Sequence, residues 1–139
     1  MKKRDRIRGD VIMGLEKDME TKDYSQAQRK WVREEVCLLV SEYFRTKALS
    51  NEEIQKSHEL VSRILRNREK ILTGSQISDT FRNIDGITMQ SARIKCLDPD
   101  TPYSRMPGTR LQKEIVDEYL ENPATIKAEA YDVICKYSI

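Results

Sequence analysis

Apolar residues recur at helical spacing along most of this chain of 139 residues. The clearest run lies between 31 and 46, where Val32, Val36, Leu39, Val40 and Tyr43 fall at i, i+4, i+7, i+8 and i+11. That spacing places them on one wide face of an α-helix, which must pack against other elements to leave water. We predict that this segment is the strongest helix of the fold.

Other segments repeat the pattern and carry helix start and stop signals. Ser50 and Glu53 stand in capping-box register before an apolar stripe that ends at Thr73-Gly74-Ser75. Asn122-Pro123 is a cap followed by a first-turn proline, ahead of the last apolar stripe. Further stripes predict helices near 7–19, 86–97 and 111–120.

These elements predict an all-α helical bundle without strands. We divide the chain into a basic N-terminal arm and helix at 1–30 and a single helical domain at 31–139. Within that domain, a tri-helical, helix-turn-helix-like core spans 31–99, and a C-terminal helical pair spans 108–139. Three prolines between 98 and 107 disfavour a helix there and predict a loop between the two parts.

The stretch Thr80–Asp100 predicts a short helix with two unlike faces. We place it at about 86–97, with Asp85 as its N-cap. At 100° per residue, the inward face gathers Ile87, Ser91, Ile94 and Leu97, and the outward face gathers Thr88, Met89, Ala92, Arg93, Lys95 and Cys96. The outward face is therefore small, polar and basic, and we expect no acidic residue on it.

Charge is unevenly distributed, although the formal net charge is only +2. Residues 1–8 hold five basic residues against one acidic, and residues 62–99 hold seven against four. From residue 100 onward, five basic residues stand against seven acidic ones. A basic surplus at the N-terminus and around the short helix is the asymmetry expected for an anionic partner, although ordinary solvated helix faces produce it too.

The composition lacks the residues that disulfide frameworks, metal sites, histidine-based catalytic sites and phosphate-binding loops require. Three scattered cysteines form neither a disulfide framework nor a metal-ligand spacing, and the single histidine, His58, does not supply the imidazole pairs of hydrolase and nuclease sites. The five glycines never cluster into a phosphate-binding loop. We predict no catalytic residue, no metal site and no cofactor, and therefore not an enzyme.

The same composition bears on the compartment. No stretch approaches the ~20 apolar residues of a membrane span, and no apolar segment follows the basic N-terminus as in an export signal. With so few cysteines, reduced thiols are expected. We predict a cytoplasmic location and no membrane partner.

The short helix suggests nucleic-acid binding. It follows two longer amphipathic helices and presents a basic face, which is how tri-helical DNA readers place a recognition helix in the major groove, about 12 Å wide. Three-helix units that bind nothing share this pattern. We expect double-stranded DNA as partner and leave a homodimer open. The predicted DNA-binding residues are Lys3, Arg4, Arg82, Asn83, Thr88, Met89, Ala92, Arg93, Lys95, Arg105 and Arg110.

A family resemblance points the same way. The chain carries W-x-R-E-E-V at 31–36 and Y-F-R at 43–45, then F-R-N-I-D-G-I-T-M at 81–89 and L-D-P-D at 97–100, then L-x-x-E-I-x-D-E-Y at 111–119. In this order the motifs resemble the N-terminal region of bacterial HNH-family restriction endonucleases, across about 31–122. The resemblance implies a helical DNA-recognition region, which in that family precedes a C-terminal HNH nuclease. Some members of the family are modification-dependent.

Two departures from the family pattern bear on function. After Met89 the family carries a lysine and a bulky apolar residue, whereas this chain has Gln90 and Ser91, so the family's target sequence or modification is not carried over. A single histidine cannot form an HNH site. The chain is therefore either the part that precedes a nuclease or a stand-alone relative that binds without cutting.

Two other functions fit the same sequence. A nuclease-less relative of a defence enzyme, encoded by a phage or mobile element, would act as an anti-defence inhibitor that binds a nuclease or another defence component. Its candidate contact is Tyr103–Pro107 in the proline-rich loop. A transcriptional regulator is the third interpretation, and it would select palindromic sites.

Overall fold

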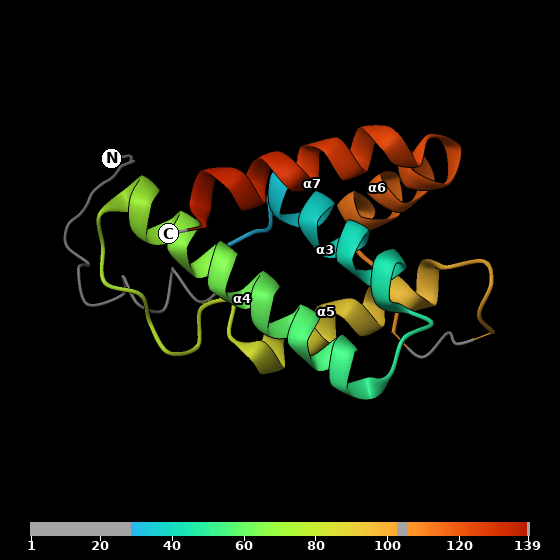
Figure 1. The fold of residues 1–139 in the computed structure, drawn as a ribbon, viewed down its shortest axis with the longest axis horizontal. Coiled ribbons are helices and arrows are strands. Elements are labelled where there is room, and N and C mark those ends of the chain that lie inside the picture. The colour runs from blue at the N-terminus through green and yellow to red at the C-terminus, as the bar shows by residue number, and fades with distance from the viewer. Residues whose placement is uncertain (1–28, 103–105, 139) are drawn as a thin grey trace, which may run out of the picture.

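The computed structural model describes residues 29–102 and 106–138. The predicted helix near 7–19, Lys3, Arg4 and Arg105 lie outside these residues. The described part contains five helices and no strand, so the all-α prediction is confirmed. The helices are α3 (Arg33–Thr46), α4 (Asn51–Thr73), α5 (Ile84–Leu97), α6 (Arg110–Glu121) and α7 (Pro123–Tyr137), as Figure 1 shows.

The central helix is α3. Its residues Val36, Cys37, Leu38, Leu39 and Val40 are all buried, so this helix is covered on every side. It packs against the four other described helices, and most extensively against α7. In Figure 1 it lies between the α6–α7 pair and the α4–α5 pair. The C-terminal pair therefore shares one hydrophobic core with α3, α4 and α5.

Most helix ends follow the signals in the sequence. The Ser50 hydroxyl accepts a hydrogen bond from the Glu53 amide at 3.2 Å, which begins α4. Gly74 ends α4 in the left-handed region at φ 68°, where a residue without Cβ is favoured. Pro123 occupies the first turn of α7.

The start of α5 differs from the prediction. The helix begins at Ile84, and its N-cap is Asn83, whose side-chain oxygen accepts a hydrogen bond from the Gly86 amide at 2.8 Å. The prediction of Asp85 as the cap is wrong, because that residue lies in the first turn. No helix within the described ranges is both long and apolar enough to cross a membrane.

Candidate nucleic-acid interface

The inward face of α5 is the one that the sequence predicts. Ile87 and Ile94 are fully buried, and Ser91 and Leu97 are partly buried. On the other side, Thr88, Met89 and Lys95 are exposed, while Ala92, Arg93 and Cys96 are partly covered. The inward placement of Ile87 and Ile94 is therefore confirmed, whereas Ala92, Arg93 and Cys96 of the predicted outward face are covered to a degree similar to Ser91 and Leu97.

The outward face is less uniform than expected. Because α5 begins two residues earlier than predicted, exposed Asp85 belongs to the helix. At 100° per residue, Asp85 falls between Ala92 and Cys96 around the axis. The expectation of an acid-free face is wrong, and a carboxylate stands at its N-terminal end.

Arg82 does not lie at a surface. Its side chain forms a two-point ion pair with Glu35, with nitrogen–oxygen distances of 2.9 and 3.0 Å. The guanidinium also donates to the carbonyl oxygens of Arg29 and Lys30. Only 6% of the residue is exposed. The predicted phosphate contact by Arg82 is therefore corrected, since this charge is already neutralised in the interior.

Asn83 has a structural role beside it. Its side-chain oxygen holds the first turn of α5, and the residue is half-buried. The oxygen that would accept a hydrogen bond from a base is therefore engaged with the backbone. Asn83 starts the predicted recognition helix, and its predicted contact with DNA gains no support from this placement.

Arg93 is anchored to the loop before α6. Its Nη1 donates to the Pro107 carbonyl oxygen at 2.8 Å, and its Nε is buried and has no hydrogen-bond partner among the described residues. The same loop places the Met106 amide 3.3 Å from the Cys96 sulfur. Arg93 is thus held along the side of α5, and it must leave Pro107 before it can reach a base.

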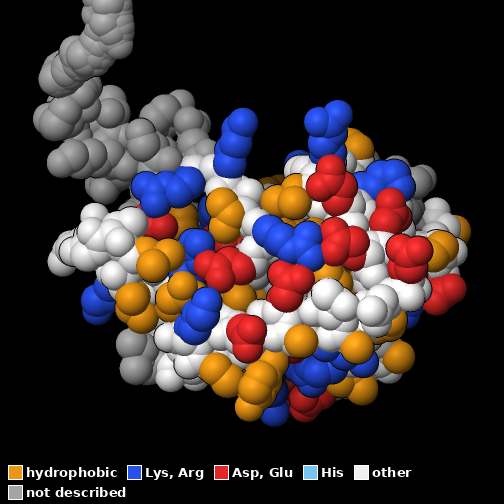
Figure 2. All heavy atoms as spheres, turned by 90° about the horizontal axis from the view of Figure 1, so that it is seen from above, with side chains coloured by type: hydrophobic (Ala, Val, Ile, Leu, Met, Phe, Trp, Pro, Cys, Tyr) orange, Lys and Arg blue, Asp and Glu red, His pale blue; other side chains and the backbone are white. Residues whose placement is uncertain are grey.

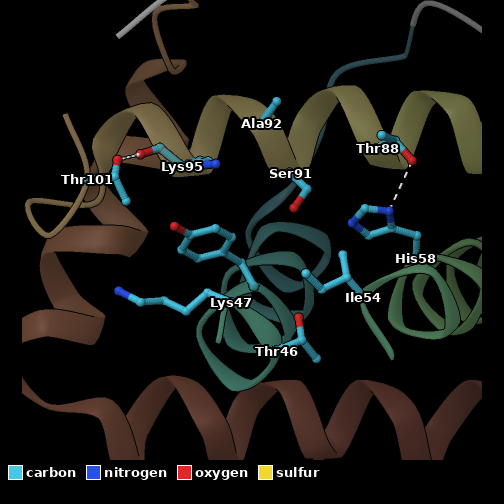
Figure 3. A pocket seen from close by; sticks show the side chains of 10 residues that line it. Thr46, Lys47, Ile54, His58, Thr88, Ser91, Ala92, Lys95 and Thr101 are labelled. Atoms are coloured by element: carbon cyan, nitrogen blue, oxygen red, sulfur yellow. Dashed lines mark hydrogen bonds between the residues drawn. The ribbon is translucent and has the colours of Figure 1, made fainter. Parts of the chain in front are cut away.

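Three of the predicted DNA-binding residues lie on the side of α5 that faces α3 and α4. Thr88, Ala92 and Lys95 line a cavity of about 280 Å³ between α5, α4 and α3. Figure 3 shows the Thr88 hydroxyl against the His58 ring of α4, and the distance from Oγ1 to Nδ1 is 3.0 Å. The predicted base-facing residues are therefore divided between two sides of one helix.

Arg110 lies in a groove on the Gln90 side of α5. This groove, which we call the basic groove, has a volume of about 560 Å³. It is lined by Arg29, Lys30, Trp31, Gln90, Thr109, Arg110, Leu111 and Gln112. Among the residues that the structure describes, no carboxylate lines the groove, although Arg29 forms an ion pair with Glu69. The groove combines basic side chains with an indole, which suits an anionic partner.

The N-terminus of α6 adds positive partial charge to the basic groove. Helix α6 begins at Arg110, and its first turn contains no acidic residue. The positive end of the helix dipole therefore adds to the charge of the side chains. One wall is held in place, because the Gln112 side-chain Nε2 donates a hydrogen bond to the Gln90 side-chain oxygen at 2.7 Å and Gln112 is 1% exposed.

Sequence reasoning predicted only Arg110 among the residues that line this groove. The basic and aromatic lining residues that it missed are Arg29, Lys30 and Trp31. The available signal was the Arg29-Lys30 pair directly before an aromatic residue. Its proximity to Gln90 and Arg110 depends on tertiary packing. Periodicity within one helix carries no information on that packing.

The face that carries α7 has a different character. Figure 2, seen from above relative to Figure 1, shows acidic and basic side chains intermixed with apolar ones. On this side Arg33 of α3 bonds Glu118 of α6 and Glu129 of α7, at distances from 2.7 to 3.0 Å. The hydrogen bonds from Arg33 lower the pKa of both carboxyl groups. These ion pairs connect α3 with α6 and α7. Their charges balance one another and do not form a basic surface.

Neither a metal site nor a similar known protein adds to what the geometry indicates about function. Within the described ranges, no group of three or more His, Cys, Asp or Glu side chains is placed to hold a metal ion. Comparison with protein-family models, with curated proteins and with solved structures finds no match to this chain.

Proposed function

We propose that this chain is a DNA-binding specificity module, and that the basic groove is its contact with the phosphate backbone. The proposal is supported by the resemblance of the motifs between 31 and 122 and by one structural observation. That observation is that no carboxylate belongs to the described lining of the basic groove, where Lys30, which precedes α3, and Arg110, at the start of α6, are exposed.

The groove adjoins the part of α5 that is suited to read bases. Gln90, Arg93 and Met89 take successive positions around the helix at 100° per residue. Met89 is 45% exposed, and Arg93 adds a cation beside it. Phosphate contacts by Lys30 and Arg110 would position the duplex, and Met89 and Arg93 would contact base edges after Arg93 leaves Pro107.

A matched pair of double variants tests this function. Lys30→Gln/Arg110→Gln removes two cations of the groove, and Lys127→Gln/Lys136→Gln removes two exposed cations of α7. Fluorescence anisotropy with a labelled random duplex measures the affinity. At about 0.1 M salt, each lost phosphate contact costs about tenfold through counterion release. Because it loses two such contacts, we expect the groove variant to bind about a hundredfold more weakly than the α7 variant. Equal affinities, or no binding by the parent chain, would overturn the proposal.

One observation supports a second function, binding to a protein. Tyr131 of α7 is 67% exposed, and exposed Ala128 and Cys135 lie on the same side of the helix. An exposed tyrosine among small residues is a suitable anchor for a protein partner. A pull-down with purified nuclease or defence components, using Tyr131→Ser and Lys127→Gln, tests it. Loss of capture with Tyr131→Ser alone supports the function, and equal capture by both variants counts against it.

A further inference from the structure

The basic groove is large enough to enclose more than a phosphate group. Its volume of about 560 Å³ lies within the range of small-molecule sites. A double helix can only lie across a groove of this size, whereas one nucleotide that has left its base pair can enter it.

Two apolar side chains form walls of the groove. They are Trp31, just before α3, and Leu111, in the first turn of α6, and both are half-buried. The Arg82 guanidinium lies over one face of the indole, with its carbon 4.3 Å from the ring centre. Trp31 therefore has its other face and its edge to offer to the groove. Aromatic and apolar side chains are what proteins place against an unstacked base.

A chain of hydrogen bonds fixes the orientation of the Gln90 side-chain amide. The Thr109 backbone amide donates to the Gln112 side chain at 3.0 Å, so the accepting atom must be the oxygen. The other end of that side chain is then Nε2, which donates to Gln90 at 2.7 Å. The Gln90 atom in this contact is therefore also the oxygen, and its two N–H groups are left over.

The N–H groups of Gln90 are available to a ligand. Gln90 lines the groove, and its Nε2 is neither buried nor hydrogen-bonded to another described residue. The cationic side chains of the lining and the indole N–H are also donors only. A base that presents carbonyl oxygens satisfies such donors, whereas adenine presents an amine in place of a carbonyl oxygen.

Positive charge stands beside each apolar wall. Lys30 directly precedes Trp31, and Arg110 directly precedes Leu111. Both cations are exposed, and neither forms an ion pair within the part of the chain that the structure describes. Arg29 is different, because it is paired with a carboxylate of α4. The two unpaired cations suit the phosphates on either side of a nucleotide.

We propose that the basic groove binds one unpaired nucleotide of a DNA strand, and that it prefers a base with a carbonyl oxygen, such as guanine, to adenine. The base would pack against Trp31 and Leu111, and the Gln90 N–H groups would donate to the carbonyl oxygen. Lys30 and Arg110 would contact the flanking phosphates. This inference rests on the proposed function, because it uses the same contact of the groove with the DNA backbone.

Trp31 gives the test its signal, because it is the only tryptophan of the chain. Its fluorescence is followed during titration with a paired duplex, with the same duplex carrying one unpaired guanine or one unpaired adenine, and with the corresponding single strands. A base packed on the indole is expected to quench the emission saturably. The guanine-containing duplex is expected to bind about tenfold more tightly than the paired and the adenine-containing duplexes.

The two purines are matched in size and differ in the carbonyl group, so their ratio of affinities reports on the hydrogen bond. The single strands identify the source of the nucleotide. A guanine preference in the single strands as well assigns the groove to any unpaired strand, and a preference confined to the duplexes assigns it to a base that leaves a double helix.

One substitution exchanges the donors without removing the contact that holds them. Gln90→Glu keeps an oxygen for Gln112 and replaces the N–H groups by a second oxygen. The ratio of guanine to adenine affinity is expected to fall by about tenfold, to equality. Gln55→Glu, at an exposed position of α4, makes the same change of charge outside the groove and is expected to keep the parental ratio.

Three results would overturn this inference and leave the proposed function in place. They are equal binding of the paired and guanine-containing duplexes, binding of the latter without quenching, and a parental ratio in Gln90→Glu. In each case, weaker binding of the paired duplex by Lys30→Gln/Arg110→Gln would still support the backbone contact. Absence of binding to every DNA would overturn both proposals.

Discussion

Arg82 and Glu35 form an ion pair in the interior, with 4% and 2% of their side chains exposed. The same carboxylate accepts a hydrogen bond from the Val32 amide at 3.0 Å, and so caps α3. The guanidinium carbon of Arg82 lies 4.3 Å from the ring centre of Trp31 and 4.5 Å from that of Phe81. One ion pair between residues 47 positions apart thus holds the N-terminal ends of α3 and α5 next to each other.

Other residues of the resembling motifs meet in the same way. The Tyr43 hydroxyl donates to Asp98 at 2.8 Å, and the ring of Phe44 stacks on Tyr119 at 4.3 Å. These contacts connect Y-F-R with L-D-P-D and with the D-E-Y motif. Much of what these motifs encode is therefore the packing of the bundle. A residue in such a motif is not by that fact a ligand of DNA.

Removal of the Arg82 side chain is predicted to destabilise the fold strongly. In Arg82→Ala, the Glu35 carboxylate stays buried without its partner, which costs about 3–5 kcal/mol of unfolding free energy. Urea denaturation measures the loss. Arg63→Ala, at an exposed position of α4, is the control and should stay within about 0.5 kcal/mol of the parent. Parental stability in Arg82→Ala would show that the ion pair is not required by the fold.

The burial of Arg82 is an example of what could not be predicted from the sequence. Local periodicity places Ile87 and Ile94 inward correctly, because a helix repeats its faces whatever its neighbours are. The partner of Arg82 comes from another helix, and the Pro107 carbonyl that holds Arg93 comes from a loop. Such pairings depend on how the helices pack. A charge count treats both arginines as free, although one is neutralised and the other is anchored.

The cap of α5 gives a second prediction. Asn83→Ala leaves the Gly86 amide without its acceptor and should lower the unfolding free energy by about 1 kcal/mol. Asn83→Ser keeps a capping oxygen and should recover most of that loss. Chemical denaturation of the parent and both variants is the measurement. If Asp85→Ala alone produced the larger loss, the assignment of Asn83 as the cap would be wrong.

Asp98 gives a prediction for acid stability. Burial opposes its ionisation most strongly, but hydrogen bonds from Lys47, the Asp100 amide and Tyr43 outweigh it and lower its pKa. A carboxyl with a lowered folded pKa stabilises fully above its unfolded value of about 3.9, and the stabilisation is lost as the pH falls through the folded value. Stability should therefore decline below about pH 4.

Replacement of this carboxyl should flatten that decline. Asp98→Asn should be less stable at neutral pH, and its unfolding free energy should fall less steeply in acid, by at most about 1.4 kcal/mol per pH unit. Urea titrations from neutral to acid pH give the slopes. Asp100→Asn, which changes an exposed residue, is the comparison and should retain the parental slope. Identical slopes for all three proteins would exclude Asp98 as a source of acid sensitivity.

The thiols should differ in reactivity. Cys37 is fully buried, and burial, reinforced by the charge of Glu129, raises its thiol pKa to about 12. Cys135 is exposed on α7. Since the thiolate is the reactive form, iodoacetamide at about pH 8 should label Cys135 in the folded protein and label Cys37 only in urea. Peptide mass spectrometry locates the label. Labelling of both cysteines at one rate in the folded state would contradict the burial of Cys37.

Salt dependence separates phosphate contacts from other effects of the groove variants. For duplex DNA, the slope of log affinity against log salt is about −0.9 for each neutralised phosphate. If Lys30 and Arg110 each contact a phosphate, Lys30→Gln/Arg110→Gln should reduce the magnitude of this slope by about 2. Met89→Ala should change the preference among sequences and leave the slope unaltered, because a methionine neutralises no charge. Anisotropy titrations between about 50 and 200 mM salt provide both quantities. A groove variant that binds weakly with an unchanged slope would mean that its cations act through the fold.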